Sequence, residues 1–265
     1  EAVQKDILNG NTNEQLLAIW HYFSLGRSAR DPSGIRAERT GLKVTNRTRV
    51  YRGRSRVAGY RGIAVGFPGG MNYAFNALNG TLSALWSGEF LNVSWGGQGS
   101  GNFNPRSRTI ELAQDVTFYR LDKDDGPWPL RPVMDKDNPV NPNPLYPRNL
   151  GYQFKGYQLD EEGVPTFMYR TGDVAVEDRV AADQQNRLER RFRFNAPKAE
   201  TVYLRALTGN VRLLAPAQFA TGAVKMWVPE DTALLRGEGD TRELVLKLKL
   251  PEGKSDVEIR YELLR

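Results

Sequence analysis

The stretch "RGIAVGFPGGMNYAFNALNGTLSALWSGEFLNVSWGGQGSG", residues Arg61–Gly101, decides the fold class. It joins short apolar runs through Pro-Gly-Gly and Asn-Gly turns, which is the pattern of antiparallel hairpins. Short alternating runs of the same kind continue from about Gly41 to the last residues of the sequence. The sequence therefore predicts a mainly β protein, an antiparallel β-sandwich, either single or built from two fused sandwiches of the supersandwich kind.

Two segments differ from this pattern. Residues 12–26 carry apolar side chains at helical spacing and end at Gly26, so we expect the only long helix there, in an N-terminal segment of residues 1–35. Residues 36–265 form the β-sandwich domain. Within it, the Pro- and Asp-rich segment 121–151 has no periodicity, and we expect a strap over one sheet, acting either as a lid or as a plain crossover.

Regions 73–93 and 157–178 share a hairpin pattern that could reflect duplication.

The chain has no cysteine and one histidine, His21. A disulfide, a thiolate nucleophile, a Cys/His zinc site and a covalently attached haem are therefore excluded. His21 lies within the predicted helix, where packing is its expected role. An enzyme built on this sequence would need carboxylates, Tyr, Lys, Arg or an oxygen-ligated metal.

The formal net charge is +6 and the pI is near 9.5. The basic runs Arg47–Arg56 and Arg187–Phe194 are short and alternate with other residues, so we expect their arginines on the solvent face of strands and no nucleic-acid partner. No apolar run reaches the roughly 20 residues that a bilayer-spanning helix needs, and we expect no membrane insertion. The chain opens with Glu1 rather than Met, which predicts a segment of a longer protein.

The quoted stretch also contains candidate ligand-binding residues. Flat aromatic faces beside amide groups are the usual components of a carbohydrate-binding platform. On this ground the ligand-binding candidates are Arg61, Asn72, Tyr73, Trp95, Gln98 and Trp128. A platform requires Trp95 and Trp128 to be partly exposed, whereas Trp86, in phase with Leu82 and Ala84, is expected in the core. The glycines of "WGGQGSG" are followed by no helix pattern, so they do not predict a dinucleotide site.

Acidic residues provide two further sets of candidates. Three carboxylates of "TGDVAVEDR" could supply the acid/base pair of a carbohydrate-active enzyme, namely Asp173, Glu177 and Asp178. Alternation along a strand would place Asp173 and Glu177 on the same face. Turn carboxylates within the strap could hold calcium, although they do not form an EF-hand loop, and these are Asp122, Asp124, Asp135 and Asp137.

Several motifs occur in an order that resembles a known group of proteins. "WHYFSLGRSARDPSGI", the stretch from Tyr60 to Ser94, "WGGQGSG", "DDGPWP" and "FKGYQLDEEGVPTFMYRTGDVAVED" resemble the C-terminal region of large multidomain c-type cytochrome proteins of the planctomycete type. The resemblance spans about residues 15–180. It implies that the first helix is similar to the closing helix of a cytochrome c domain, that haem c belongs to a partner subunit or a separate domain, and that the protein is periplasmic or at the cell surface.

These observations favour one function over two alternatives. The preferred hypothesis is a non-catalytic module of a cytochrome c-linked oxidation system that binds carbohydrate or docks a haem-bearing redox partner. The alternatives are a carbohydrate-active lyase or hydrolase that uses the carboxylates above, and a structural subunit of a larger haem-protein assembly.

Overall fold

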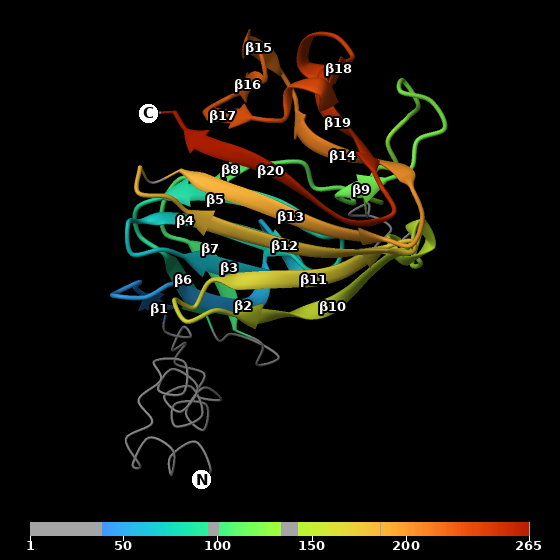
Figure 1. Cartoon of the computed structure of the whole chain (residues 1–265). Coiled ribbons are helices and arrows are strands. Elements are labelled where there is room, and N and C mark those ends of the chain that lie inside the picture. The colour runs from blue at the N-terminus through green and yellow to red at the C-terminus, as the bar shows by residue number, and fades with distance from the viewer. Residues whose placement is uncertain (1–38, 95–100, 134–142, 186, 265) are drawn as a thin grey trace.

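The computed structural model describes residues 39–94, 101–133, 143–185 and 187–264. These residues form four antiparallel sheets, and their helical segments are single 3₁₀ turns, so the predicted mainly β sandwich is confirmed (Figure 1). The helix expected within residues 12–26, and His21 with it, lies outside the described residues. No helix in the described ranges is long and apolar enough to cross a membrane.

The largest sheet has eight strands and forms one layer of the sandwich. In spatial order they are β10 (Tyr152–Leu159), β11 (Pro165–Thr171), β12 (Val174–Ala182), β13 (Leu188–Ala196), β20 (Gly253–Leu263), β17 (Val224–Trp227), β16 (Gln218–Thr221) and β15 (Arg212–Ala215). Its central strands alternate strictly between buried and exposed residues, as in a sheet with one face on the core.

Two smaller sheets cover the inner face of this layer. The five-stranded sheet contains β2 (Arg49–Ser55), β3 (Gly59–Gly66), β4 (Met71–Asn76), β5 (Thr81–Ser87) and β8 (Ile110–Glu111). The four-stranded sheet contains β18 (Ala233–Arg236), β19 (Glu243–Leu250), β14 (Glu200–Thr208) and β9 (Phe118–Tyr119). Aromatic contacts join the layers: Phe75 stacks on Phe167 at 3.9 Å between centroids, and Phe118 contacts Phe192 and Phe194 edge-on.

A third layer of three strands packs on the outside of the five-stranded sheet. It consists of β1 (Arg39–Leu42), β6 (Leu91–Ser94) and β7 (Asn102–Pro105). In the five-stranded sheet, Ala64, Ala74 and Ala84 are directly opposite one another and belong to the same apolar cluster as Leu91 and Phe103 of the third layer. The five-stranded sheet is thus covered on both faces, which explains why every residue of β4 is buried and why the stretch is almost free of charge.

Two details differ from the sequence-based expectations. Trp86 is in phase with Ala84, and both lie in the cluster under the third layer, but Leu82 lies in the main core. The pairing of β4 with β5 shifts register between Ala74 and Phe75, and this shift turns Leu82 to the opposite face of the sheet. The alternating run "RTIELAQDVTFYRL", residues 108–121, forms only the short strands β8 and β9, because the chain crosses here from the five-stranded to the four-stranded sheet.

Part of segment 121–151 lies against the outer face of the four-stranded sheet. Trp128 packs on Tyr203 and Val245 and donates a hydrogen bond to the Val116 carbonyl oxygen at 3.2 Å. Tyr146 accepts a hydrogen bond from the Val116 amide at 2.6 Å. Leu130 and Leu145, which could have served as anchors, are exposed instead.

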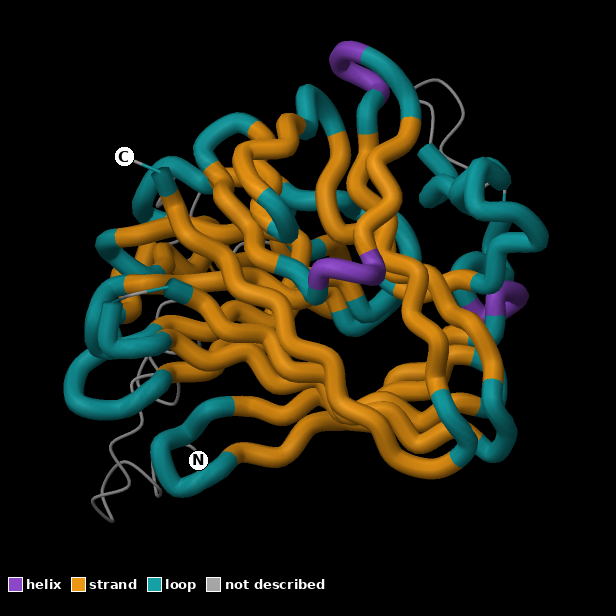
Figure 2. Tube along the Cα trace, turned by 45° about the horizontal axis from the view of Figure 1, so that its top comes forward, coloured by secondary structure: helices purple, strands orange, loops and turns teal. Residues whose placement is uncertain are grey.

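The helical turns lie in connections between strands (purple in Figure 2). They are η1 (Arg148–Leu150), η2 (Glu230–Thr232) and η3 (Gly239–Thr241). The main apolar cluster takes residues from Ile63 to Tyr261, on both sides of the strap in the sequence. The proposed division into two sub-sandwiches stays a prediction.

Candidate functional site

The predicted carbohydrate platform does not form from the described candidates. Asn72 and Tyr73 are fully buried in β4. The Asn72 amide donates to the carbonyl oxygens of Gly70 and Gly88, at 2.9 and 3.2 Å, and so fastens two adjacent hairpin turns. Tyr73 lies against Phe67 and Phe167 in the main core. Both residues therefore have structural roles, and sequence alone missed this because the segments that cover the two faces of β4 are distant from it in the chain.

The remaining platform candidates do not come together either. Trp128 is 6% exposed, which contradicts the expectation of a partly exposed ring. Arg61 is exposed on β3, in a different sheet from the one that Trp128 covers. Trp95 and Gln98 lie outside the described residues. Trp86 is fully buried, as predicted, and donates to the Phe90 carbonyl oxygen at 3.1 Å.

The three candidate catalytic carboxylates lie in different environments. Asp173 is exposed in the turn before β12, and Glu177 is exposed on the outer face of β12, 3.4 Å from Arg193. Asp178 points to the opposite face and is fully buried. An acid/base pair of Glu177 and Asp178 is therefore ruled out, because the sheet separates the two carboxylates.

Asp178 forms a buried ion pair with Arg190 of β13. Tyr169 donates a hydrogen bond to the same carboxylate at 3.0 Å, and Arg190 also donates to the Gly80 carbonyl oxygen at 3.2 Å. Burial and, secondarily, the Asp178 charge raise the pKa of Tyr169 and Tyr152 well above the ordinary value. Burial alone would lower the pKa of Arg190, but its pairing with Asp178 raises it. This closed network ties the layers together and presents no group to a ligand.

The calcium candidates of the strap are engaged otherwise or undescribed. The Asp124 carboxylate accepts hydrogen bonds from Lys247 at 2.9 Å and from Tyr203 at 2.7 Å, and these bonds lower its pKa. Asp122 is exposed. Asp135 and Asp137 lie outside the described residues. Among the described residues, no group of three or more His, Cys, Asp or Glu side chains is placed to hold a metal ion.

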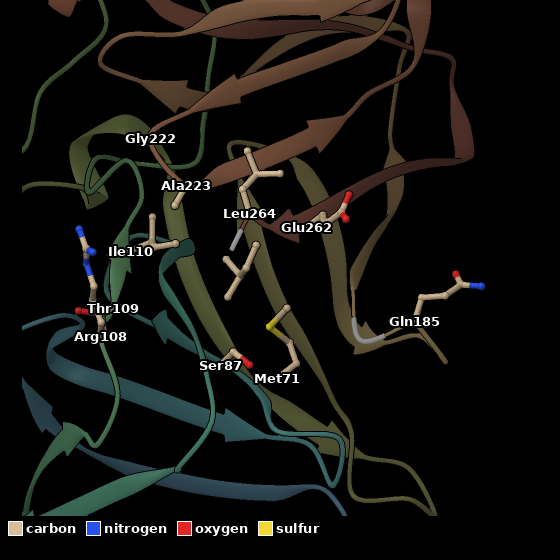
Figure 3. Close-up of a pocket in the computed structure, with 11 residues that line it drawn as sticks. Met71, Ser87, Arg108, Thr109, Ile110, Gln185, Gly222, Ala223, Glu262 and Leu264 are labelled. Carbon is tan, nitrogen blue, oxygen red and sulfur yellow. The ribbon is translucent and has the colours of Figure 1, made fainter.

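A different surface has the properties of a binding site. A cleft of about 810 Å³ opens at one end of the sandwich, between the strand ends of the five-stranded sheet and the C-terminal end of β20. We call it the end cleft. Its apolar lining consists of Met71, Ile110, Ala223, Leu263 and Leu264. Its polar lining consists of Ser87, Arg108, Thr109, Gln185 and Glu262. Figure 3 shows the apolar side chains between Arg108 on one side and Gln185 on the other.

A partly exposed tryptophan lies beside this cleft. Trp227 ends β17 on the outer face of the eight-stranded sheet, directly opposite Arg260 of β20. The Lys225 ammonium lies 4.4 Å from the Trp227 ring centroid, and Lys225 is opposite Glu262, which lines the cleft. On the other flank, the Arg187 guanidinium is 5.9 Å from the same centroid and donates to the Gln185 side chain, which also lines the cleft. Trp227 is thus connected to the lining of the end cleft through Arg187 and Lys225.

This surface can bind but is poorly equipped for hydrolysis. Its volume is in the range of ligand pockets, roughly 300 to 1,000 Å³. It offers an aromatic ring, cationic donors and hydroxyl groups around an apolar floor, which suits a polyhydroxylated ligand. Glu262 is the one carboxylate among the described residues that line the cleft, whereas glycosidases use two, roughly 5 to 9.5 Å apart.

Sequence reasoning missed this surface because its parts are far apart along the chain. Ser87 ends β5 and Thr109 precedes β8, whereas Gln185 lies between β12 and β13 and Glu262 lies in β20. One signal was present: in "AVKMWVP" the alternation puts Trp227 out of phase with the buried Val224 and Met226. A large aromatic on the polar face of a strand is a candidate ligand contact.

Comparisons with known proteins give little further information. No family model matches the chain, and no curated protein matches it. Among solved structures, it is similar to a protein described as a kojibiose phosphorylase from the human microbiome, with 11% identity and a TM-score of 0.34 over 85% of this chain. It is also similar to a heparinase III gene product, with 10% identity and a TM-score of 0.32 over 98% of this chain. The chain spans 33% and 41% of the lengths of these two proteins.

Proposed function

We propose that this chain is a non-catalytic β-sandwich module that binds carbohydrate in its end cleft. The observation that carries the proposal is the position of Trp227, a partly exposed ring whose neighbours Lys225 and Arg187 lie next to residues that line an 810 Å³ cleft. A sugar ring can pack an apolar face on an indole while its hydroxyl groups bond to flanking polar side chains. Gln185 and Glu262 are such side chains here.

The module belongs, on this proposal, to an oxidation system linked to a c-type cytochrome, in the periplasm or at the cell surface. The support is the resemblance of residues 15–180 to the C-terminal region of multidomain c-type cytochromes. Haem c would be held by a partner subunit or a separate domain, because this chain has no cysteine for its attachment. A C-x-x-C-H motif encoded just upstream would support the association.

Two variants test the binding proposal, one beside the end cleft and one within it. Trp227→Ala removes the aromatic ring, and Ser87→Trp places bulk in the cleft from the five-stranded sheet. Ala175→Trp, on the exposed face of β12, is a control that adds the same side chain outside the cleft. The wild type is first screened on a glycan array, and the best glycan is then measured by isothermal titration calorimetry.

We expect Trp227→Ala to weaken binding by roughly 1 to 3 kcal/mol, the usual range for an interface anchor. Ser87→Trp should weaken it as well, and Ala175→Trp should not. If the array retains no glycan, or if all three variants bind equally well, the proposal is wrong. Release of reducing sugar from the bound glycan, lost in Glu262→Gln, would instead support a hydrolase that uses Glu262, a different carboxylate from those that the sequence suggested.

A further inference from the structure

The hairpin of β2 and β3 has an unusual charge distribution. Residues 41–88 contain no Asp or Glu, but they contain seven basic residues: Lys43, Arg47, Arg49, Arg52, Arg54, Arg56 and Arg61. β2 is the edge strand of the five-stranded sheet, next to β10 at the edge of the eight-stranded sheet. We call the exposed group of Arg52, Arg54, Tyr60 and Arg61 the basic edge.

Within the part of the chain that the structure describes, the arginines of the basic edge have no acidic partner. Arg56 is paired with Glu111 at 3.0 Å, and Arg47 donates to the Glu161 carbonyl oxygen. No described carboxylate lies within 4.0 Å of Arg52, Arg54 or Arg61. The outer face of the eight-stranded sheet differs in this respect: Arg193 contacts Glu177 and Asp256, and Arg191 contacts Glu189 and Glu258. Positive charge is neutralised on that face and is left unbalanced on the basic edge.

Two tyrosines hold these arginines in place. The Arg54 guanidinium lies 4.5 Å from the ring centroid of Tyr60, which is nevertheless 64% exposed. The Arg52 guanidinium lies 5.9 Å from the ring centroid of Tyr157 on β10. A guanidinium stacked on a ring keeps its N–H edge free, and this edge can bind a carboxylate or sulfate group with two parallel hydrogen bonds.

We propose that the basic edge binds a linear acidic polysaccharide. Arg52 and Arg54 are two residues apart on an extended strand, hence roughly 7 Å apart along it, which presents the cations in a row. A protein partner would need an apolar centre in its interface, whereas Tyr60 is the one large exposed hydrophobic residue in the described hairpin 49–66. A row of cations with one open aromatic ring suits an anionic sugar polymer better. The inference rests on the proposed carbohydrate binding and adds the ligand's charge and a second contact surface.

The test compares two double variants that remove the same charge from the full chain. Arg52→Gln with Arg54→Gln changes the basic edge, and Arg191→Gln with Arg193→Gln changes the neutralised face of the eight-stranded sheet. Binding of polygalacturonate and of dextran sulfate is measured by titration calorimetry at low and high salt, with neutral dextran, poly-L-glutamate and duplex DNA as comparison ligands. Because all four arginines are exposed, circular dichroism should show both double variants folded.

We expect the wild type to bind both acidic polysaccharides, and to bind them more weakly at high salt because salt screens the charges. The basic-edge variant should lose at least tenfold in affinity, because it loses the hydrogen bonds that two charged side chains would donate. The control should lose less than threefold. Equal losses in the two double variants would show a response to net charge alone and overturn the proposal. Equal affinity for poly-L-glutamate or DNA would overturn the assignment to polysaccharide, as would no binding of either acidic polysaccharide.

The end-cleft variant Trp227→Ala separates this inference from the proposed function. If the end cleft binds no glycan but the basic-edge variant still loses affinity for acidic polysaccharide, the proposed cleft fails and the basic edge stands. If Trp227→Ala abolishes neutral glycan binding while the basic-edge variant binds acidic polysaccharide like the wild type, the cleft stands and this inference fails.

Discussion

Arg190 binds the Asp178 carboxylate through two parallel hydrogen bonds inside the core, from Nε to Oδ1 at 2.9 Å and from Nη2 to Oδ2 at 2.6 Å. The side chains are 3% and 0% exposed. They are diagonal neighbours on β12 and β13, and Arg190 reaches across to Gly80 in the turn between β4 and β5. The pair therefore links two layers of the sandwich.

Removing one member of this pair should be costly. Asp178→Ala leaves a buried guanidinium without its counter-charge, and we expect a loss of about 3 to 5 kcal/mol in the free energy of unfolding. Replacing both residues with apolar ones, Asp178→Leu with Arg190→Met, should recover most of that loss, because neither charge then has to be desolvated. Equilibrium unfolding in urea measures both changes. A double variant as unstable as Asp178→Ala would contradict this explanation.

Buried and partly exposed tryptophans should respond differently to truncation. Trp86 and Trp128 are buried in separate apolar clusters, so Trp86→Ala and Trp128→Ala should each destabilise the fold by about 3 to 5 kcal/mol. Trp227→Ala should cost less than about 1.5 kcal/mol, because part of that ring is already in water. Thermal unfolding followed by circular dichroism ranks the three variants. A Trp128→Ala variant as stable as Trp227→Ala would show that the strap contributes little to packing.

These tryptophans also show what the sequence could and could not predict. Period-two alternation and glycine turns were enough for the strands, since those signals are local. Whether a strand is covered on one face or on two depends on segments distant in sequence, such as β6 and β7 above the alanines of the five-stranded sheet. Tyr73 and Trp128 were placed at a surface, whereas each is buried against residues distant in the sequence. The end cleft is assembled from six separate segments, and the phase of Trp227 beside it was the one local signal.

Gly53 should tolerate no side chain. A Cβ added there would collide with the backbone oxygen of Gly101 and approach the Tyr51 ring to 3.0 Å. Because a backbone atom cannot move aside cheaply, Gly53→Ala should separate β2 from the third layer and cost at least about 2 kcal/mol, as overpacking does. Gly253→Ala is the comparison: a Cβ there meets nothing within 4 Å, and the cost of its positive φ is roughly 1 kcal/mol. Similar unfolding midpoints for the two variants in urea would refute the collision.

Asp124 should make the strap sensitive to acid. Hydrogen bonds from Lys247 and Tyr203 lower the pKa of Asp124 in the folded protein below its unfolded value of about 3.8. A lowered pKa stabilises the folded state fully above the unfolded value, and this contribution is lost as the pH falls through the folded value. Asp124→Asn should therefore be less stable than the wild type at pH 6, and the difference should shrink towards pH 3. Urea unfolding at the two pH values checks this. The same difference in free energy of unfolding between wild type and Asp124→Asn at both pH values would show that ionisation of Asp124 does not cause the acid sensitivity.

The position of β20 in the sheet order affects how the protein can fold. β20 lies between β13 and β17, yet it is the last described strand in the sequence, and its partner β13 ends at Ala196. Until β20 is added, the eight-stranded sheet is two separate ribbons, each with a bare edge that could pair with another chain. Synthesis from the N-terminus supplies this central strand late, and pairings between such distant residues form slowly. Nascent chains should accordingly rely on chaperones until Gly253–Leu263 has left the ribosome, and truncation before Gly253 should yield aggregates instead of a smaller folded protein.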